Sequence, residues 1–404
     1  MRAEWAFALP CGSLRMSHSR RATAARVGTR LRAALPVALA LGIFGLAALT
    51  GQGCADTTPP ADVVLTGGTV YTVAASMPLA SAVAIRAGEI VYVGDDDGAS
   101  RFVGPTTQVV DLAGRLVLPG FIDTHAHPVQ AAGLGYALRL SSLMSPDEVL
   151  LQVAAYAARN PERAFILGFG FDETAFGPDG PRREALDSVV SDRPVILVDA
   201  GGHSAWANSA ALDAFGIDAT SPDPIPGVHY YQRDPDGTPT GWLVESQAIF
   251  PHLAELGAFD AVAAARPNNI VYTLFSSAGV TTVYDAGMSS FEAQALEAVA
   301  EMDRQGSLRF RVVASHQIQH PDQVPTAIDR FTELRRLYDG DRLHVGMIKI
   351  HNDGTTEAHT AAYLEPYTDL PGQSGAVLLE PSVLNPFVVA VDRAGIDLHI
   401  HALG

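Results

Sequence analysis

Residues 116–128 read L-V-L-P-G-F-I-D-T-H-A-H-P, and the interpretation of the remaining chain depends on them. A proline and a glycine interrupt the apolar run, and residues 121–124 then have the composition of a short buried strand. Side chains at positions i and i+2 of a strand point to the same side. The sequence therefore predicts that His125 and His127 lie together at a strand end, where two imidazoles can bind one metal ion. The alternative is a pair of polar residues at a strand–loop junction.

The chain is acidic overall but basic at its start. Its 404 residues carry a formal net charge of −17, which disfavours nucleic acid and anionic membranes as partners. Residues 1–54 instead carry seven arginines and one acidic residue, followed by an apolar run and T-G-Q-G-C. This pattern is typical of an export signal, with Met1 or Met16 as its start. We therefore expect an exported protein.

Cys54 is a candidate lipidation site, because it follows the apolar run and small residues. It would make the protein a periplasmic or outer-membrane lipoprotein tethered to the membrane. Plain secretion and an uncleaved membrane anchor are the alternatives. Cys11 and Cys54 are the only cysteines, so the exported body has no thiol left to bind metal. Any metal site must use nitrogen and oxygen ligands, which suits zinc, manganese or iron.

The remaining chain divides into a linker, a small β unit and a large α/β unit. Residues 55–61 form the linker. Residues 62–115 alternate β-branched residues with glycine turns, which predicts antiparallel hairpins of a β-sandwich. Residues 116–404 alternate strands with helices, which predicts a (β/α)8-type TIM barrel, with an insertion of mixed structure at about 160–265. The expected helices are 146–159, 268–277, 291–305, 322–337 and 381–394, and the later strands are 279–287, 308–315, 344–354 and 396–404.

Five strand–helix units are too few to close an eight-stranded barrel, so we expect a chain truncated at its carboxyl end. Active sites of such barrels lie at the carboxyl ends of the strands. The residues found there are of types that bind metals or transfer protons, which indicates a metal enzyme: His125, His127, Asp285, Ser315, His316, residues 349–353, His399 and His401.

Lys349 carries a separate signal, because it is the only lysine beside 26 arginines. Arginine cannot deprotonate, so a single lysine in an apolar strand suggests an amine that must become neutral. One such use is reaction with CO₂ to form a carbamate that bridges two metal ions. The alternative is a buried lysine paired with an acid.

Other residues are candidates for ligands or for substrate contacts. His401, at the strand end, is favoured as a ligand, whereas His399 is either a hydrogen-bonded core residue or a substrate contact. His203 either lines the substrate pocket beside Trp206 and Asn208 or caps a helix. Asp353 is also expected to contact substrate. The remaining histidines in loops and helices are expected at the surface: His18, His229, His252, His320, His344 and His359.

Four motifs together resemble the metal-dependent amidohydrolases related to urease: V-L-P-G-F-I-D-T-H-A-H, G-V-T-T-V-Y-D-A-G, M-I-K-I-H-N-D-G and L-H-I-H-A-L-G. More narrowly, residues 62–404 resemble amidohydrolase family 3, the branch with N-substituted formamide deformylases. The resemblance implies a barrel with an N-terminal sandwich. It also implies that His125, His127, Lys349 (carboxylated in many relatives) and His401 are metal ligands. The family's sixth-strand histidine and eighth-strand aspartate have no counterpart here.

We therefore expect the general-base aspartate beyond residue 404, the alternative being a chain that cannot turn over substrate. The predicted function is hydrolysis of amide-type, non-peptide carbon–nitrogen bonds in a small molecule by water activated on one or two divalent ions, with zinc expected. Two alternatives share the barrel. One is a non-catalytic exported lipoprotein that binds a small molecule, and the other is an ester or phosphotriester hydrolase.

Overall fold

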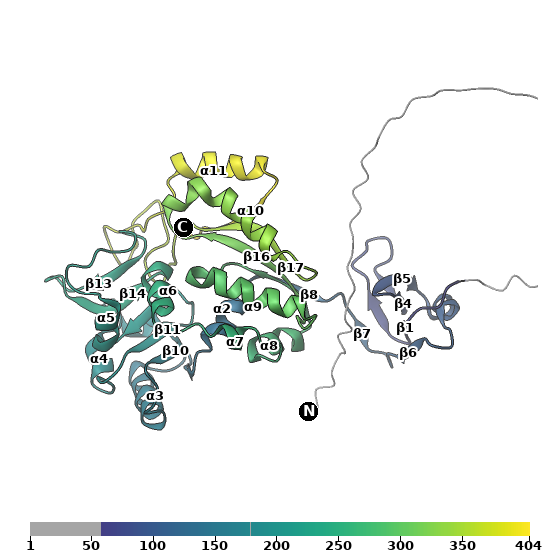
Figure 1. Cartoon of the computed structure of the whole chain (residues 1–404), viewed down its shortest axis with the longest axis horizontal. Coiled ribbons are helices and arrows are strands. Elements are labelled where there is room, and N and C mark those ends of the chain that lie inside the picture. Colours follow the sequence, from purple (N-terminus) through teal and green to yellow (C-terminus); the bar gives the residue numbers. More distant parts are fainter. Residues whose placement is uncertain (1–57, 178) are drawn as a thin grey trace, which may run out of the picture. The chain divides into compact units, whose positions relative to one another are not determined.

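The computed structural model describes residues 58–177 and 179–404, which form two compact units, one ending at Pro119 and one comprising Gly120–Gly404 (Figure 1). The expected export segment and the lipidation site Cys54 lie outside the described residues and stay predictions. Within 58–177 and 179–404, no helix combines the length and the apolar character needed to cross a bilayer.

The unit ending at Pro119 contains two small sheets, in the orders β5-β4-β1-β6 and β3-β2-β7. The expected antiparallel pairing is found for β1–β4, β4–β5 and β2–β3. However, β6 pairs in parallel with β1, and β7 in parallel with β2. A parallel neighbour requires a crossover, which α1 (Asp96–Ala99) and the 3₁₀ helix η1 (Ser100–Phe102) provide before β6. The strands are β1 (Val63–Thr66), β2 (Thr69–Tyr71), β3 (Leu79–Ala80), β4 (Ala82–Arg86), β5 (Glu89–Gly94), β6 (Gln108–Asp111) and β7 (Leu116–Val117).

The second unit is built on a sheet of five parallel strands in the order β18-β17-β16-β15-β8. Each strand pairs in parallel with its neighbour in the sheet. Helices connect the strands, and a second sheet also lies between β8 and β15 in the chain. Parallel strands joined by helices form the wall of a (β/α)8 barrel, so the five-stranded sheet is part of such a barrel, as predicted. The strands are β8 (Phe121–Ala126), β15 (Val280–Asp285), β16 (Arg311–Ile318), β17 (Leu343–His351) and β18 (Asp397–His401).

Helices cover one face of this sheet, and a shared apolar core joins them to it. On β17, Ile348 and Ile350 belong to that core, so the alternate residues Lys349 and His351 point to the other face. The predicted helix 322–337 begins as the 3₁₀ helix η4 (Pro321–Thr326), because Pro325 cannot donate a helical hydrogen bond. The other elements are α2 (Pro128–Leu134), α7 (Ala261–Ala264), α8 (Ile270–Ser277), η3 (Ser289–Phe291), α9 (Glu292–Arg304), α10 (Ala327–Tyr338) and α11 (Pro381–Arg393).

A six-stranded sheet, here called the inserted sheet, lies in the chain between α2 and α6 (Figure 1), in the order β13-β14-β12-β11-β10-β9. It begins at β9, earlier than the expected residue 160, and α3 (Pro146–Arg159) packs on it through Val149, Val153 and Ala157. Its elements are β9 (Leu138–Arg139), β10 (Ile166–Phe171), η2 (Glu173–Phe176), α4 (Arg183–Asp187), β11 (Val195–Asp199), β12 (Ser204–Ala207), α5 (Ser209–Phe215), β13 (Tyr230–Arg233), β14 (Pro239–Val244) and α6 (Ser246–Glu255).

Candidate metal centre

A cavity of about 470 Å³ is lined by residues from the barrel strand ends and from the inserted sheet. All four ligands predicted from the sequence line it, namely His125, His127, Lys349 and His401. The structure therefore brings together four side chains that are up to 276 positions apart in the chain.

Strand register explains why these side chains share one face. Lys349 is the register partner of His399, and His351 is the partner of His401, on the parallel strands β17 and β18. Residues two apart on a strand, and partners on neighbouring strands, point to the same side of a sheet. The face opposite the helices therefore carries one lysine and three histidines on two strands.

A hydrogen bond to the backbone orients the His127 ring and leaves its other ring nitrogen free. Its Nδ1 lies 2.7 Å from the carbonyl oxygen of Gly287, and since a carbonyl only accepts, Nδ1 carries the proton. The fully buried Asp285 accepts from the backbone N–H groups of Val129 and Gly287, both at 3.3 Å, and so fixes this turn. Burial lowers the pKa of His127 to about 4, so the ring is neutral and Nε2 can bind a metal ion.

His125 faces both its predicted partner and His399. Its ring centroid lies 5.9 Å from that of His127 and 4.9 Å from that of His399. Burial and the nearby Lys349 lower the pKa of His125. His399 places its Nδ1 3.1 Å from the Tyr284 hydroxyl and is absent from the cavity lining. His399 is thus hydrogen-bonded and half-buried next to His125, and its expected substrate contact stays a prediction.

Lys349 is buried without an acidic partner. Its side chain is 3% exposed, and among the described residues no carboxylate lies within ion-pair distance of it. Burial lowers the pKa of Lys349 to about 8. A substantial fraction of the amine is therefore neutral near physiological pH, the form that reacts with CO₂.

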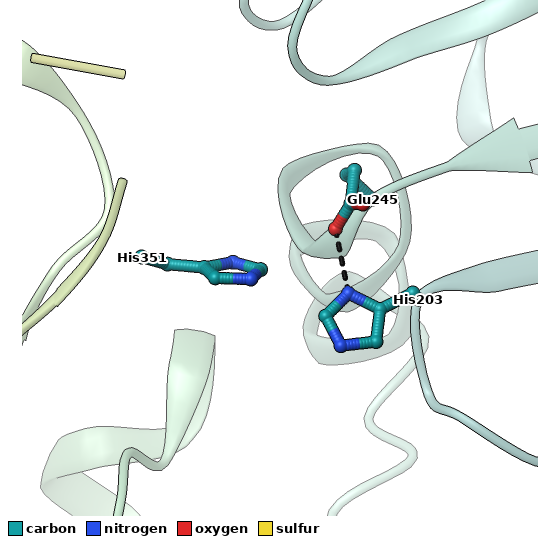
Figure 2. Close-up of side chains that lie close together, drawn as sticks. All are labelled: His203, Glu245 and His351. Carbon is teal, nitrogen blue, oxygen red and sulfur yellow. Dashed lines mark hydrogen bonds and ion pairs between the residues drawn. The ribbon is translucent and has the colours of Figure 1, made fainter. Parts of the chain in front are cut away.

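A second cluster contains His203, Glu245 and His351, whose ligand atoms all lie within 4.8 Å of one another (Figure 2). His203 Nδ1 lies 2.8 Å from Glu245 Oε2, and Glu245 Oε1 accepts from the Thr360 hydroxyl at 2.7 Å. Burial lowers the pKa of His351 well below its usual range, so this ring is neutral. Two imidazoles and a carboxylate form a donor set that fits a divalent ion of the zinc type.

The turn after β11 positions His203. Asp199 accepts from the backbone N–H groups of Gly201, His203 and Ser204, each at 2.7 Å. Burial alone would lower the pKa of His203, but the neighbouring carboxylates, led by Glu245, outweigh it and raise the pKa. His203 therefore lines the cavity and does not cap the following helix.

His401 has one nitrogen engaged by the loop after β17. Its Nε2 lies 3.0 Å from the carbonyl oxygen of Gly354, which leaves Nδ1 free for a ligand. Asp353 is 3% exposed and accepts from the backbone N–H groups of Ala362, Leu403 and Gly404 at 2.8–3.0 Å. The expectation that Asp353 contacts substrate is corrected, because its carboxylate fixes this loop and does not line the cavity.

Trp206 and Asn208 are also corrected, because both are fully buried outside the cavity. Strand β12 lies inside the inserted sheet with apolar clusters on both faces, so Trp206 packs in one core and its Nε1 donates to the carbonyl of Arg182. Asn208 is the N-cap of α5. Of this motif, His203 lines the cavity, whereas Trp206 and Asn208 belong to the core behind it.

The histidines expected at the surface divide into four groups. His320 and His344 are exposed, His252 and His359 are half-buried, and His18 lies outside the described residues. For His229 the expectation was wrong, because it is 2% exposed and its Nδ1 accepts from the backbone N–H of Gln247. His316, at a strand end, points to the helix side and pairs with Glu292 at 2.7 Å.

Sequence reasoning missed Glu245 as a candidate ligand, and it included His351 only within the strand-end segment 349–353 without predicting it as a ligand. The i, i+2 spacing that identified His125 and His127 also relates Lys349 to His351, so that signal was present. Glu245 follows a strand of the inserted sheet, and no spacing in the chain links it to the barrel.

The chain matches the amidohydrolase family over residues 108–404. It is 34% identical to the exoenzymes regulatory protein AepA of Pectobacterium carotovorum subsp. carotovorum, over 83% of this chain and 72% of that protein. It is 29% identical to N-substituted formamide deformylase of Arthrobacter pascens, over 85% and 63%. A metal-dependent hydrolase from Pyrococcus horikoshii superposes with a TM-score of 0.60 at 25% identity, over 85% and 65%.

Protein LONG AFTER FAR-RED 3 of Arabidopsis thaliana is 31% identical over 86% of this chain and 60% of its own length. The chain thus spans less than two thirds of the length of several of these relatives. The match nevertheless includes all of the barrel strands and the inserted sheet. The chain therefore belongs to the amidohydrolase family.

Proposed function

We propose that this protein is a metal-dependent hydrolase of amide-type, non-peptide carbon–nitrogen bonds in small molecules. The observation that carries the proposal is the convergence of His125, His127, Lys349 and His401 on one cavity. Similarity to an N-substituted formamide deformylase supports the amide class.

A divalent ion at this site, with zinc expected, would activate water for attack on a carbonyl. The residues prepare that chemistry in separate ways. Gly287 orients His127, and burial keeps the rings of His125 and His127 neutral, as a metal ligand requires. Lys349, as a neutral amine, can add to CO₂ and release a proton, and the resulting carbamate would bridge two ions.

Aromatic and basic side chains that line the cavity suggest which chemical groups the substrate carries. Tyr136 and Phe169 stack with ring centroids 4.8 Å apart, and both line the cavity with Phe250. Arg139, the register partner of Phe169, also lines the cavity and forms no ion pair with any described residue. These contacts fit an amide with an aromatic or other apolar group and an acidic group that Arg139 binds.

The test measures bound metal and amide hydrolysis in parallel. In the wild-type chain, we expect bound zinc and chelator-sensitive release of amine from N-formyl and N-acyl aromatic amides. Lys349→Met should lower both metal affinity and hydrolysis by more than about 100-fold. His316→Gln is the matched control, since His316 lies on the neighbouring strand but faces the helices.

Metal content separates two failures. If the chain binds metal in a Lys349-dependent way but does not hydrolyse these amides, the metal site is correct and the proposed substrate class is wrong. A chain that binds no zinc, or that hydrolyses amides equally well after chelation, would contradict the proposal.

A further inference from the structure

We propose that His203, Glu245 and His351 form a second divalent-cation site, which lies beside the predicted ligand His401 but uses none of the predicted ligands, and which β17 and the inserted sheet build jointly (Figure 2). We call these three residues the junction site. The inference does not depend on amide hydrolysis, because it concerns only which residues bind a cation.

The spacing of the donors supports a cation. Ligand atoms about 2.0–2.2 Å from a tetrahedral zinc ion are separated from one another by roughly 3.3–3.5 Å. In the structure the three ligand atoms lie within 4.8 Å of one another, and a bound cation would replace the hydrogen bond of 2.8 Å between His203 and Glu245. Small side-chain rotations within the cluster are enough to reach coordination distances.

Buried negative charge around His203 provides a separate reason. Three carboxylates interact with this ring, namely those of Glu245, Asp199 and Glu173, and each of these residues is at most 6% exposed. Among the described residues, no arginine or lysine forms an ion pair with any of the three. Glu173 Oε2 is also buried without a hydrogen-bond partner. Buried charge requires compensation, and the single histidine ring of His203 faces the buried carboxylates of Glu245 and Asp199, so a divalent cation would balance them.

His351 is the least explained side chain of the cluster unless it binds something. It is 8% exposed, and among the described residues its ring forms no hydrogen bond. Its ring centroid lies 5.2 Å from that of His203 and 4.3 Å from that of His401. A neutral imidazole has one lone pair that can bind a metal ion, and the His351 ring presents its nitrogens to the cavity among other histidines.

The backbone holds Glu245 in an unfavourable conformation to present its carboxylate. Its φ is +69°, a region that non-glycine residues seldom occupy. A hydrogen bond of 2.6 Å from its backbone N–H to the carbonyl of His203 and the Thr360 hydroxyl fix the residue on both sides. Such strain persists where the surroundings enforce it, and it clusters at functional positions.

The experiment is a titration of the demetallated full chain with Co²⁺ and Zn²⁺, with bound ions counted by elemental analysis and cobalt coordination followed by visible absorption. Glu245→Gln and His351→Gln should each lose one equivalent of metal, or bind it at least 100-fold more weakly. The double variant His125→Gln/His127→Gln should keep that equivalent. His252→Gln is the control, because this half-buried ring contacts Tyr231 and Phe215, away from both sets of ligands.

The proposal is overturned if Glu245→Gln and His351→Gln bind as many ions as the wild type with unchanged affinity. It is equally overturned if the His125/His127 double variant loses all bound metal at once. Thermal unfolding of each metal-free variant verifies that it folds, and His203→Gln replaces any variant that does not. A junction site that binds metal in a chain without hydrolytic activity would support this inference while contradicting the proposed function.

Discussion

Asn208→Ala is expected to destabilise the second unit by about 3–5 kcal/mol without directly touching the cavity. The Asn208 side chain is completely buried and makes four hydrogen bonds with the backbone. Its Oδ1 accepts from Val195 and Ala211 at 3.0 and 2.9 Å, and its Nδ2 donates to Val190 and Arg193 at 2.9 and 3.0 Å. Each bond contributes about 1 kcal/mol, and the loss of the α5 N-cap is part of that total.

The assay is urea unfolding followed by circular dichroism. Asn160→Ala is the matched control, because Asn160 ends α3 and its half-exposed side chain makes one hydrogen bond, to the Tyr156 carbonyl. We expect the control to lose no more than about 1 kcal/mol. An Asn208→Ala variant as stable as the control, but with weakened substrate binding, would refute the structural role and restore Asn208 to the pocket.

Two further substitutions test the packing beside the candidate site. Burial raises the pKa of Glu173 from its ordinary value of 4.5 to about 7. Between these two pH values the folded chain keeps a proton that the unfolded chain releases. The free energy of unfolding should therefore fall as the pH rises from 4.5 to 7. Glu173→Gln should remove this loss of stability, which amounts to about 3 kcal/mol. The measurement is the free energy of unfolding at pH 5 and pH 8, and a variant with the same pH dependence as the wild type would contradict the prediction. Gly241→Ala should lower the free energy of unfolding by several kcal/mol. The φ angle of Gly241 is +98°, and an added Cβ would clash with the Ala207 carbonyl and lie 2.9 Å from the Arg183 backbone nitrogen. Gly216→Ala, with φ of +67° and open space, should cost about 1–2 kcal/mol, and equal melting temperatures for the two would refute the steric argument.

The barrel strands were predictable because their chemistry repeats. Each is an apolar run that ends in a polar residue and is followed by an amphipathic helix, which is the signal of parallel strands joined by helices. β17 and β18 lie within two or three residues of the predicted ends. The main boundary error, at η4, came from treating Pro325 as helical when it interrupts the ladder.

The inserted sheet was harder to predict because its strands pair in both directions. β9, β10 and β11 are parallel, whereas β12, β13 and β14 are antiparallel. Its pairings combine local hairpins, β11 with β12 and β13 with β14, with pairings of strands that are not consecutive in the chain, such as β12 with β14. No periodicity identifies which of its faces meets the cavity. Trp206 and Asn208 were assigned to the pocket because they follow His203 closely, although β12 carries them into the core.

The rule that places chemistry at the carboxyl ends of parallel strands applies to both sheets of the second unit. In the barrel sheet it places Lys349 and His351 near the end of β17, and His401 at the end of β18. In the inserted sheet, Asp199 ends the parallel strand β11, and its carboxylate holds the turn that presents His203. On this face, β17 and β18 offer three histidines and one lysine, and the inserted sheet adds buried carboxylates. Substitutions in the inserted sheet should therefore change cation binding, although its strands lie outside the barrel wall.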